Sequence, residues 1–181
     1  AFSLVSDKEY ATLSGNFASK NSSFDRHKYK GFIKEYHESR STANFIVKSD
    51  HRYMVGALSR LNNNHQKLSS DAKKMLRASK LKLPSKNPFH NNIAQAIEIV
   101  HCIDESLRIL ENTDIKNEPV DKMQIKAGNG ISAIEVPRGT LWHEYTLNEK
   151  GIITNASIIT PTAQNLLSIQ EDIRNFAPQI I

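Results

Sequence analysis

Arg138 is a residue whose side chain could do chemistry, and it stands between Pro137 and Gly139 at the end of an alternating apolar run. A guanidinium keeps its charge at ordinary pH and presents a planar fork of five N–H donors, which suits it to bind anionic groups. Pro137 fixes the backbone beside it and removes one backbone donor. In the simpler interpretation, Arg138 pairs at the surface with Glu135 or Glu144.

Pro161 and Thr162 form a second polar position, which precedes an apolar pattern of helical period. A threonine hydroxyl can accept a hydrogen bond from a free N–H group at a helix N-terminus, and proline is favoured in the first turn. We therefore expect Pro161 and Thr162 to cap a final helix.

His143 and Cys102 also invite a ligand or nucleophile assignment. His143 alternates with Leu141 and Tyr145, which favours a hydrogen-bonded core histidine over a metal ligand. Cys102 lies in an apolar helical pattern and is interpreted as a small buried hydrophobic residue. It is the only cysteine, which excludes an intrachain thiolate cluster and agrees with a reducing, cytoplasmic setting.

The composition is that of a folded globular chain. Of the 181 residues, 39% are hydrophobic and 24% are charged, and the net charge is +5. The basic residues are scattered enough that we interpret them as solvated surface and expect no nucleic-acid partner. No window approaches the roughly 18 consecutive apolar residues of a membrane span. The sequence begins with Ala1 instead of Met, which we attribute to processing or to the design of the expressed segment.

The periodicity of apolar residues predicts an α+β fold, with a helical core and a small antiparallel β-sheet. We expect a single domain in four parts. These parts are a strand-rich lobe at 1–65, helices at 66–118, antiparallel strands at 119–160 and a helix at 161–177.

Two helices are predicted in the second part. Ser69-Ser70-Asp71 offers N-cap oxygens for a short helix that ends by Leu83. Apolar residues three or four apart predict a longer helix from Pro88 to Glu111, and its wide apolar stripe predicts a central, well-buried position.

Beyond Pro119 the apolar period changes to two, which is typical of strands. Leu141, His143 and Tyr145 are expected to face inward. The predicted strands cover 131–136, 141–147 and 152–159, with a turn at 148–151.

Three segments resemble motifs of [NiFe]-hydrogenase large subunits, in the same order along the chain. Residues 53–62 are similar to Tyr-x-Val-Gly-Pro-Leu-Ala-Arg-Leu-Asn, and 128–145 are similar to Gly-x-Gly…Glu-Ala-Pro-Arg-Gly-x-Leu-x-His. Residues 158–165 resemble the segment that contains Pro-Thr-x-x-Asn, in a variant that favours the cytoplasmic branches. Ala57 and Val136 replace the commoner Pro and Ala.

The resemblance implies the large (alpha) subunit of an enzyme that oxidises dihydrogen reversibly to protons and electrons. In that family a nickel–iron centre with carbon monoxide and cyanide ligands is held by two Cys-x-x-Cys pairs, because soft thiolates suit these metals. Neither pair occurs in this sequence. We therefore expect an internal or C-terminal-half fragment that binds no metal and is inactive by itself.

The resemblance also implies roles for individual residues. It assigns Arg138 to catalysis, with its guanidinium above the metal pair, and places Pro137, Pro161 and Thr162 in the canopy that contacts the cyanide ligands. The implied partners are an iron–sulfur small subunit and further electron-transfer subunits. The fragment could also dimerise artefactually through apolar surface that the rest of the subunit would cover.

Two alternatives remain open at this point. One is a metal-free relative, such as the quinone-site subunit of respiratory complex I, whose counterpart usually carries Lys at the position of Arg138 and lacks Pro-Thr-x-x-Asn. The other is a non-catalytic binding or structural module, which aromatic residues interleaved with a basic face would favour.

Overall fold

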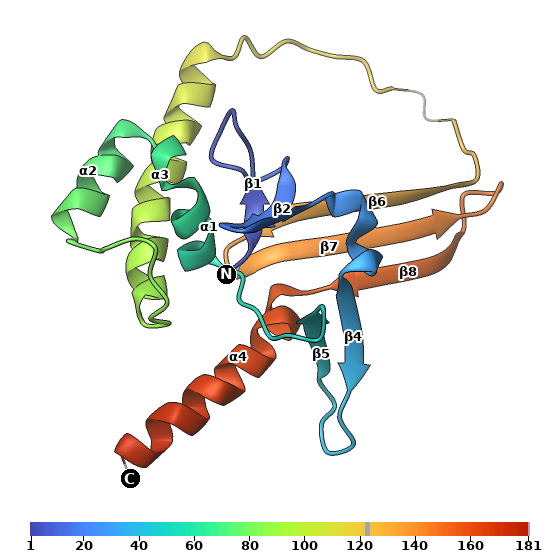
Figure 1. Cartoon of the computed structure of the whole chain (residues 1–181). Coiled ribbons are helices and arrows are strands. Elements are labelled where there is room, and N and C mark those ends of the chain that lie inside the picture. The colour runs from blue at the N-terminus through green and yellow to red at the C-terminus, as the bar shows by residue number, and fades with distance from the viewer. Residues whose placement is uncertain (122–123, 181) are drawn as a thin grey trace.

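The computed structural model describes residues 1–121 and 124–180 and contains three small antiparallel sheets and four α-helices (Figure 1). The architecture is α+β, as predicted. In chain order, the strands and α-helices are β1 (Ser3–Val5), β2 (Asn16–Ser19), β3 (Ser22–Phe24), β4 (Ile33–His37), β5 (Asn44–Lys48), α1 (Ala57–Asn64), α2 (Ser70–Ala78), α3 (His90–Asn112), β6 (Gly128–Val136), β7 (Gly139–Leu147), β8 (Ile153–Ile159) and α4 (Pro161–Phe176).

An aromatic cluster joins the N-terminal strands to the central sheet. The fully buried Phe17 of β2 lies with its ring centroid 5.2 Å from that of Trp142 of β7. The rings of Phe32 and Tyr53 pack against Phe17 from two further segments, at centroid distances of 5.9 and 6.0 Å. Buried aromatic surface of this kind supplies most of the driving force for joining short strands that are marginal alone.

Helices α1, α2 and α3 form a second apolar cluster at one side of the sheets (Figure 1). Leu61, Ala72 and Ile97, one from each helix, are completely buried. The Ser69 hydroxyl accepts a hydrogen bond from the backbone N–H of Ala72 at 3.4 Å, so the predicted N-cap of α2 is confirmed. The helix ends at Ala78, before the predicted limit.

The central sheet is a three-stranded meander in the order β6-β7-β8. The predicted strands are confirmed, although β6 and β7 are longer than expected. The predicted inward face of β7 is wrong. Thr140, Trp142 and Glu144 are buried, whereas the face that carries His143 is half-buried. Both faces of this strand carry apolar residues, so a period of two identifies the strand without deciding which face meets the core.

The expectation that the long helix is well buried is wrong for its C-terminal half. Helix α3 buries Ala94, Ile97, Glu98 and His101, which face α1 and α2. Cys102 is exposed, so the interpretation of a buried cysteine is also wrong. Its side chain, like several apolar ones, lies on faces that no other described element covers. These exposed apolar residues of α3 are Ile99, Ile103, Leu107, Ile109 and Leu110.

Two elements of the first 65 residues were not predicted as such. Strand β1 pairs with β2, and α1 occupies the end of what was expected to be a strand-rich lobe. Residues 57–64 are too short for periodicity to separate a buried helix from a strand.

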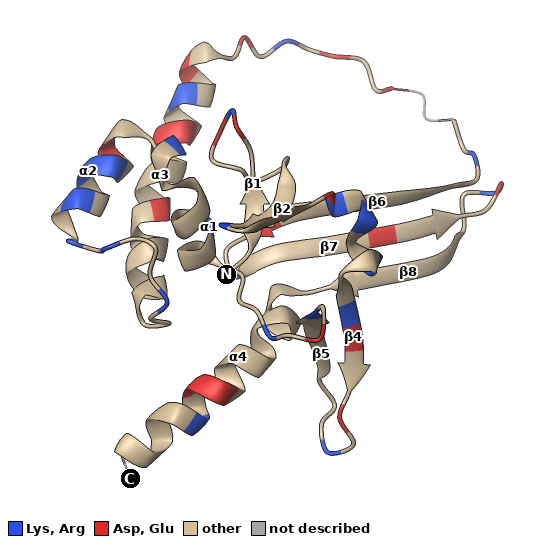
Figure 2. Cartoon of the chain, viewed as in Figure 1, with Lys and Arg blue, Asp and Glu red and all other residues tan. Residues whose placement is uncertain are grey.

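Basic residues gather on α2 and the segment that follows it (Figure 2), so the interpretation of the basic residues as scattered does not hold there. Residues 67–86 carry seven basic residues against one acidic residue, Asp71. The seven are Lys67, Lys73, Lys74, Arg77, Lys80, Lys82 and Lys86.

Among the residues that the structure describes, no helix has both the length and the apolar character needed to cross a membrane.

The contact between α3 and the start of α2 predicts a pH dependence of stability. Nδ1 of His101 accepts a hydrogen bond from the backbone N–H of Ser69 at 3.1 Å. Burial lowers the pKa of His101, and Lys73 adds to this effect, while Glu105, Glu98 and Asp104 oppose it. A histidine with a lowered pKa stabilises the fold above its unfolded pKa of about 6.5, and this contribution is lost as the pH falls through the folded pKa.

We therefore expect the free energy of urea-induced unfolding to decrease below about pH 6.5. His101→Asn should reduce this decrease, because the amide oxygen can accept from Ser69 without titrating. The exposed His51, changed to Asn, controls for the loss of one histidine. An unchanged pH profile in His101→Asn would contradict the assignment.

Candidate functional site

Val55 is the point at which the segments of the three sequence motifs meet. The side-chain amide of Asn165, in α4, bonds both backbone groups of Val55. Its Oδ1 accepts from the Val55 N–H at 2.8 Å, and its Nδ2 donates to the Val55 carbonyl at 3.1 Å. This pair of bonds satisfies the Val55 backbone as a neighbouring strand would. The last motif thus fixes the position of the first.

Gln164 connects the same helix to the central sheet. Its side chain is completely buried, and its Nε2 donates to the carbonyl oxygen of Thr140 at 2.6 Å. Its Oε1 accepts from the Tyr53 hydroxyl at 3.1 Å. Burial raises the pKa of Tyr53 well above its usual range, so the phenol remains a donor. Because the polar groups of Gln164 and Tyr53 satisfy each other, both can remain in the core at little cost.

Two glycines allow the first and second motifs to touch. Gly56 and Gly139 have φ angles of +127° and +135°, in a region that other residues rarely adopt. A Cβ atom on Gly139 would lie 2.8 Å from Cβ of Val55 and 2.9 Å from the backbone nitrogen of Gly56. A Cβ atom on Gly56 would lie 3.3 Å from the carbonyl oxygen of Arg138. The backbone around Arg138 therefore packs directly on the Val55–Gly56 segment.

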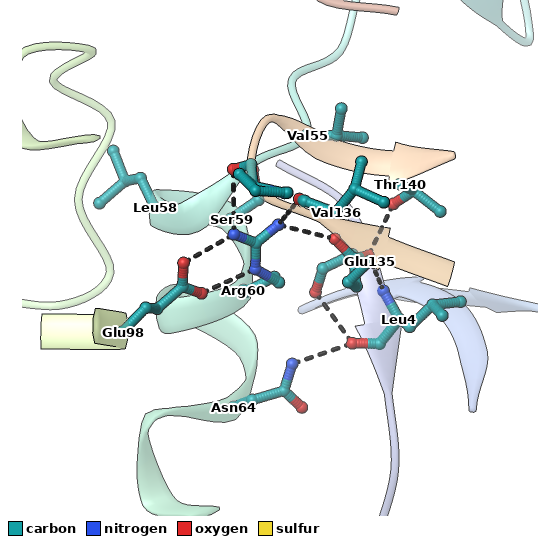
Figure 3. A network of polar contacts seen from close by, with 12 residues as sticks. Leu4, Val55, Leu58, Ser59, Arg60, Asn64, Glu98, Glu135, Val136 and Thr140 are labelled. Atoms are coloured by element: carbon teal, nitrogen blue, oxygen red, sulfur yellow. Dashed lines mark hydrogen bonds and ion pairs between the residues drawn. The ribbon is translucent and has the colours of Figure 1, made fainter. Parts of the chain in front are cut away.

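Arg60 of α1 also binds the chain that leads into this turn (Figure 3). Its guanidinium forms a two-bond ion pair with Glu98 of α3, at 2.7 and 2.6 Å, and an ion pair with Glu135 of β6 at 3.0 Å. It also donates to the carbonyl oxygens of Val136 at 2.9 Å and Pro137 at 3.2 Å. All five N–H groups of this guanidinium thus have acceptors, which its burial requires.

The carboxylates of this cluster are also saturated with donors. Glu98 accepts from the Tyr10 hydroxyl at 2.6 Å, and burial together with the Glu98 charge raises the pKa of Tyr10. Glu135 accepts from the Leu4 N–H and the Thr140 hydroxyl, each at 2.7 Å. Burial by itself would lower the pKa of Arg60, but the hydrogen bonds and charges of the two carboxylates raise it above its ordinary value. Arg60 is therefore a permanent buried cation.

A cavity of about 690 Å³ opens beside the cluster, between α3 and the end of β6. Arg60, Glu98 and Glu135 contribute polar lining, and Ile103 and Leu107 of α3 contribute apolar lining. Pro137 lies at its edge.

The predicted catalytic residue, Arg138, forms the two-residue turn between β6 and β7 together with Pro137, and both are exposed. The surface pairing considered for it is wrong, because Glu135 binds Arg60 and Glu144 binds Lys30, at 2.7 Å, and the Tyr29 hydroxyl, at 2.6 Å. Within residues 1–121 and 124–180, Arg138 takes part in no ion pair.

Pro161 and Thr162 lie at the same end of the central sheet as Arg138. Val136 pairs with Gly139 at the turn, and Ile159, the last residue of β8, pairs with Trp142 three residues further along β7. Pro161 is buried and Thr162 is exposed. Thr162 lines a separate groove of about 400 Å³ next to the β4–β5 hairpin.

The expectation that Pro161 and Thr162 cap the last helix is wrong by one position. The N-cap is Thr160, whose hydroxyl accepts from the N–H of Ala163 at 3.3 Å. Proline then occupies the first helical position, where its missing N–H group costs nothing.

His143 is hydrogen-bonded, as expected, with Nδ1 2.7 Å from the hydroxyl of Tyr145, but it is half-buried and is not the core residue that was predicted. In the part of the chain that the structure describes, no group of three or more His, Cys, Asp or Glu side chains could hold a metal ion. With a single cysteine, the donor set of this sequence does not fit a nickel–iron centre, which needs several thiolates.

No protein-family model matches the sequence. Individual proteins do. The chain is 40% identical over 162 residues to "Sulfhydrogenase 1 subunit alpha" of Pyrococcus furiosus, a match that covers 88% of this chain and 38% of that protein. It is 28% identical over 165 residues to "NAD-reducing hydrogenase HoxS subunit beta" of Cupriavidus necator, covering 85% of this chain and 34% of that protein.

Solved structures give the same result. An NAD+-reducing [NiFe]-hydrogenase in the H2-reduced state superposes with a TM-score of 0.69 at 25% identity, over 91% of this chain and 40% of that one. The chain belongs to the [NiFe]-hydrogenase large-subunit family. A Ni-Fe-Se hydrogenase from D. vulgaris Hildenborough shares the fold, with a TM-score of 0.59 at 17% identity over 91% of this chain and 42% of that one. The chain spans well under half the length of the curated relatives it matches.

Sequence reasoning missed the residues that organise this hydrogenase-family site. Arg60, Gln164 and Asn165 lie within the three motifs, but the sequence alone assigned them no role. For Arg60 a signal was present, because a charged residue inside an apolar helical stretch is rarely buried without a partner. For Asn165 the signal was its place as the asparagine of Pro-Thr-x-x-Asn, whereas Gln164 gave no comparable signal, since polar residues in the first turns of a helix are common.

The close approach of two motifs at Gly139 gives a direct test. Gly139→Ala should destabilise the fold by about 3 kcal/mol, because the methyl group would overlap Val55 and the φ angle would be strained. Gly130→Ala, at a strand position where an added Cβ would meet no atom within 4 Å, should change stability by less than about 0.5 kcal/mol. Urea unfolding of both variants measures the difference, and equal stabilities would show that the two segments do not pack in this way.

Proposed function

We propose that this chain supplies the canopy, the residues that cover the nickel–iron site of a hydrogenase. At this site dihydrogen is reversibly oxidised to protons and electrons. The observation that carries the proposal is the placement of Arg138. Its turn is held at two points, by Gly56 and by Arg60, while its own guanidinium is exposed and in no ion pair with the described carboxylates. A fixed, uncompensated cation is what a site for anionic ligands requires.

The chain's own residues would contribute binding and orientation. Arg138 would donate hydrogen bonds to anionic ligands of the metals and hold positive charge at a constant place. Pro137 would present apolar surface without a competing N–H group. At the same end of the sheet, Pro161 and Thr162 would complete the canopy, with the Thr162 hydroxyl as a hydrogen-bond donor. The metals, when bound, would supply the redox chemistry, and their thiolates would come from residues other than those of this sequence.

The partners follow from the same proposal. The electrons would leave through an iron–sulfur small subunit and further electron-transfer subunits, in the cytoplasm. The names of both relatives describe them as subunits of larger hydrogenases, which supports an assembly of this kind.

The first test concerns metal content. The purified 181-residue chain should bind no stoichiometric nickel or iron, because a single thiol cannot replace four thiolates. Elemental analysis after removal of loosely bound metal decides this. About one nickel per chain would contradict the proposal that the thiolate ligands come from residues outside this sequence.

The second test concerns Arg138 in a complete hydrogenase that contains this sequence. Arg138→Lys should leave metal content intact and slow dihydrogen oxidation about a hundredfold, because Lys keeps the charge but loses the planar donor fork. Arg40→Lys, at the turn of another hairpin, is the matched control and should change the rate little. Normal turnover of a fully metallated Arg138→Lys enzyme would remove Arg138 from the catalytic residues.

A further inference from the structure

We propose that Arg60 is the positioning residue for Arg138 and that Glu98 orients Arg60 for this task. The inference rests on the proposed function of Arg138. It concerns two residues that do not themselves reach the exposed side of the turn, since Arg60 is 4% exposed and Glu98 is 9% exposed.

The hydrogen bonds of Arg60 divide into two sets with different effects (Figure 3). Two of its N–H groups bind Glu98 of α3 and fix the plane of the guanidinium. The remaining three bind Glu135, Val136 and Pro137, which are the three residues immediately before Arg138. The side chain therefore holds the chain at every residue that leads into the turn.

The turn is also held at a second point. The carbonyl oxygen of Arg138 packs on Gly56, four residues before Arg60 in the same segment. Because Gly56 and Arg60 belong to one continuous stretch that ends in α1, a movement of α1 would move both supports of the turn together. The position of Arg138 is thereby coupled to α1 and, through Glu98, to α3.

Lysine cannot replace Arg60 in this role. An ammonium group has three donors on one atom, so it cannot reach Glu98, Glu135 and the two carbonyl oxygens from the fixed planar geometry of a guanidinium. Arg60→Lys should keep a buried positive charge between the carboxylates while releasing the Val136 and Pro137 carbonyl groups. The turn then becomes mobile without loss of the ion pair.

The experiment uses a complete hydrogenase that contains this sequence. Amide hydrogen exchange is followed by mass spectrometry in a peptide that covers 134–142 and in a reference peptide that covers 152–160. Arg60→Lys should accelerate exchange in the first peptide about tenfold and leave the second unchanged. The matched control is Arg108→Lys, which alters an exposed Arg–Glu pair of α3 with a similar N–O distance of 2.7 Å and should change neither peptide.

Turnover gives an independent measurement. If Arg60 acts through Arg138, Arg60→Lys lowers turnover, and the double variant Arg60→Lys/Arg138→Lys is no slower than Arg138→Lys alone. Rate losses that multiply would show that Arg60 acts by another route and would overturn the inference. Equal acceleration of exchange in both peptides would also overturn it, because Arg60 would then be a general stabilising residue, as would unchanged exchange in 134–142.

The experiment also covers two cases, a variant that does not fold and an Arg138→Lys enzyme that turns over normally. If Arg60→Lys yields no folded protein, Glu98→Asp replaces it, since the shorter carboxylate keeps the ion pair but draws the guanidinium away from the turn. The same local exchange and the same non-additive turnover are then expected. If Arg138→Lys turns over normally, the proposed function fails, whereas the exchange in 134–142 still decides whether Arg60 fixes the turn.

Discussion

The buried guanidinium of Arg60 is the interaction on which the rest of this structure depends. It joins α1 to α3 through Glu98 and to β6 through Glu135, and these are elements that lie 38 and 75 residues away in the sequence. Removing one partner from a buried ion cluster costs about 3–5 kcal/mol, because the remaining charges stay desolvated. The three elements, α1, α3 and β6, are therefore expected to keep their relative placement together or to lose it together.

The segment before α1 is held by neutral hydrogen bonds. Asn165 binds the backbone of Val55, and Gln164 links Tyr53 to Thr140. These side chains take the place of strand pairing, because none of the described strands pairs with the segment before α1. With the two glycines, they bring α4, α1 and the β6–β7 turn to one end of the central sheet. Helices α1 and α4 thus meet the central sheet at the end where the turn carries Arg138.

The turn that carries Arg138 lies near helix α3, which the described residues cover incompletely. Helix α3 is held on one face by α1 and α2, and on another face it leaves Ile103, Leu107 and Leu110 more than half exposed. The cavity beside Arg60 opens on that face. In the proposed function, the apolar surface beside the Arg138 turn would be covered by other polypeptide.

The sequence by itself determined the kinds of element and the family motifs. A period of 3.6 identified α2 and α3, a period of two identified β6 to β8, and Ser69 identified a helix start, because these features depend on neighbours within one or two turns. Pro137 and Arg138 were singled out by the resemblance to a family motif. Local pattern could not decide which face of β7 meets the core or how much of α3 is covered, since both faces of β7 and several faces of α3 carry apolar residues. Nor could it show that Glu135 pairs with Arg60 instead of Arg138. Such partners are chosen by the path of the whole chain, because the cost of burying a charge can be met only by whatever group the fold brings within hydrogen-bond distance.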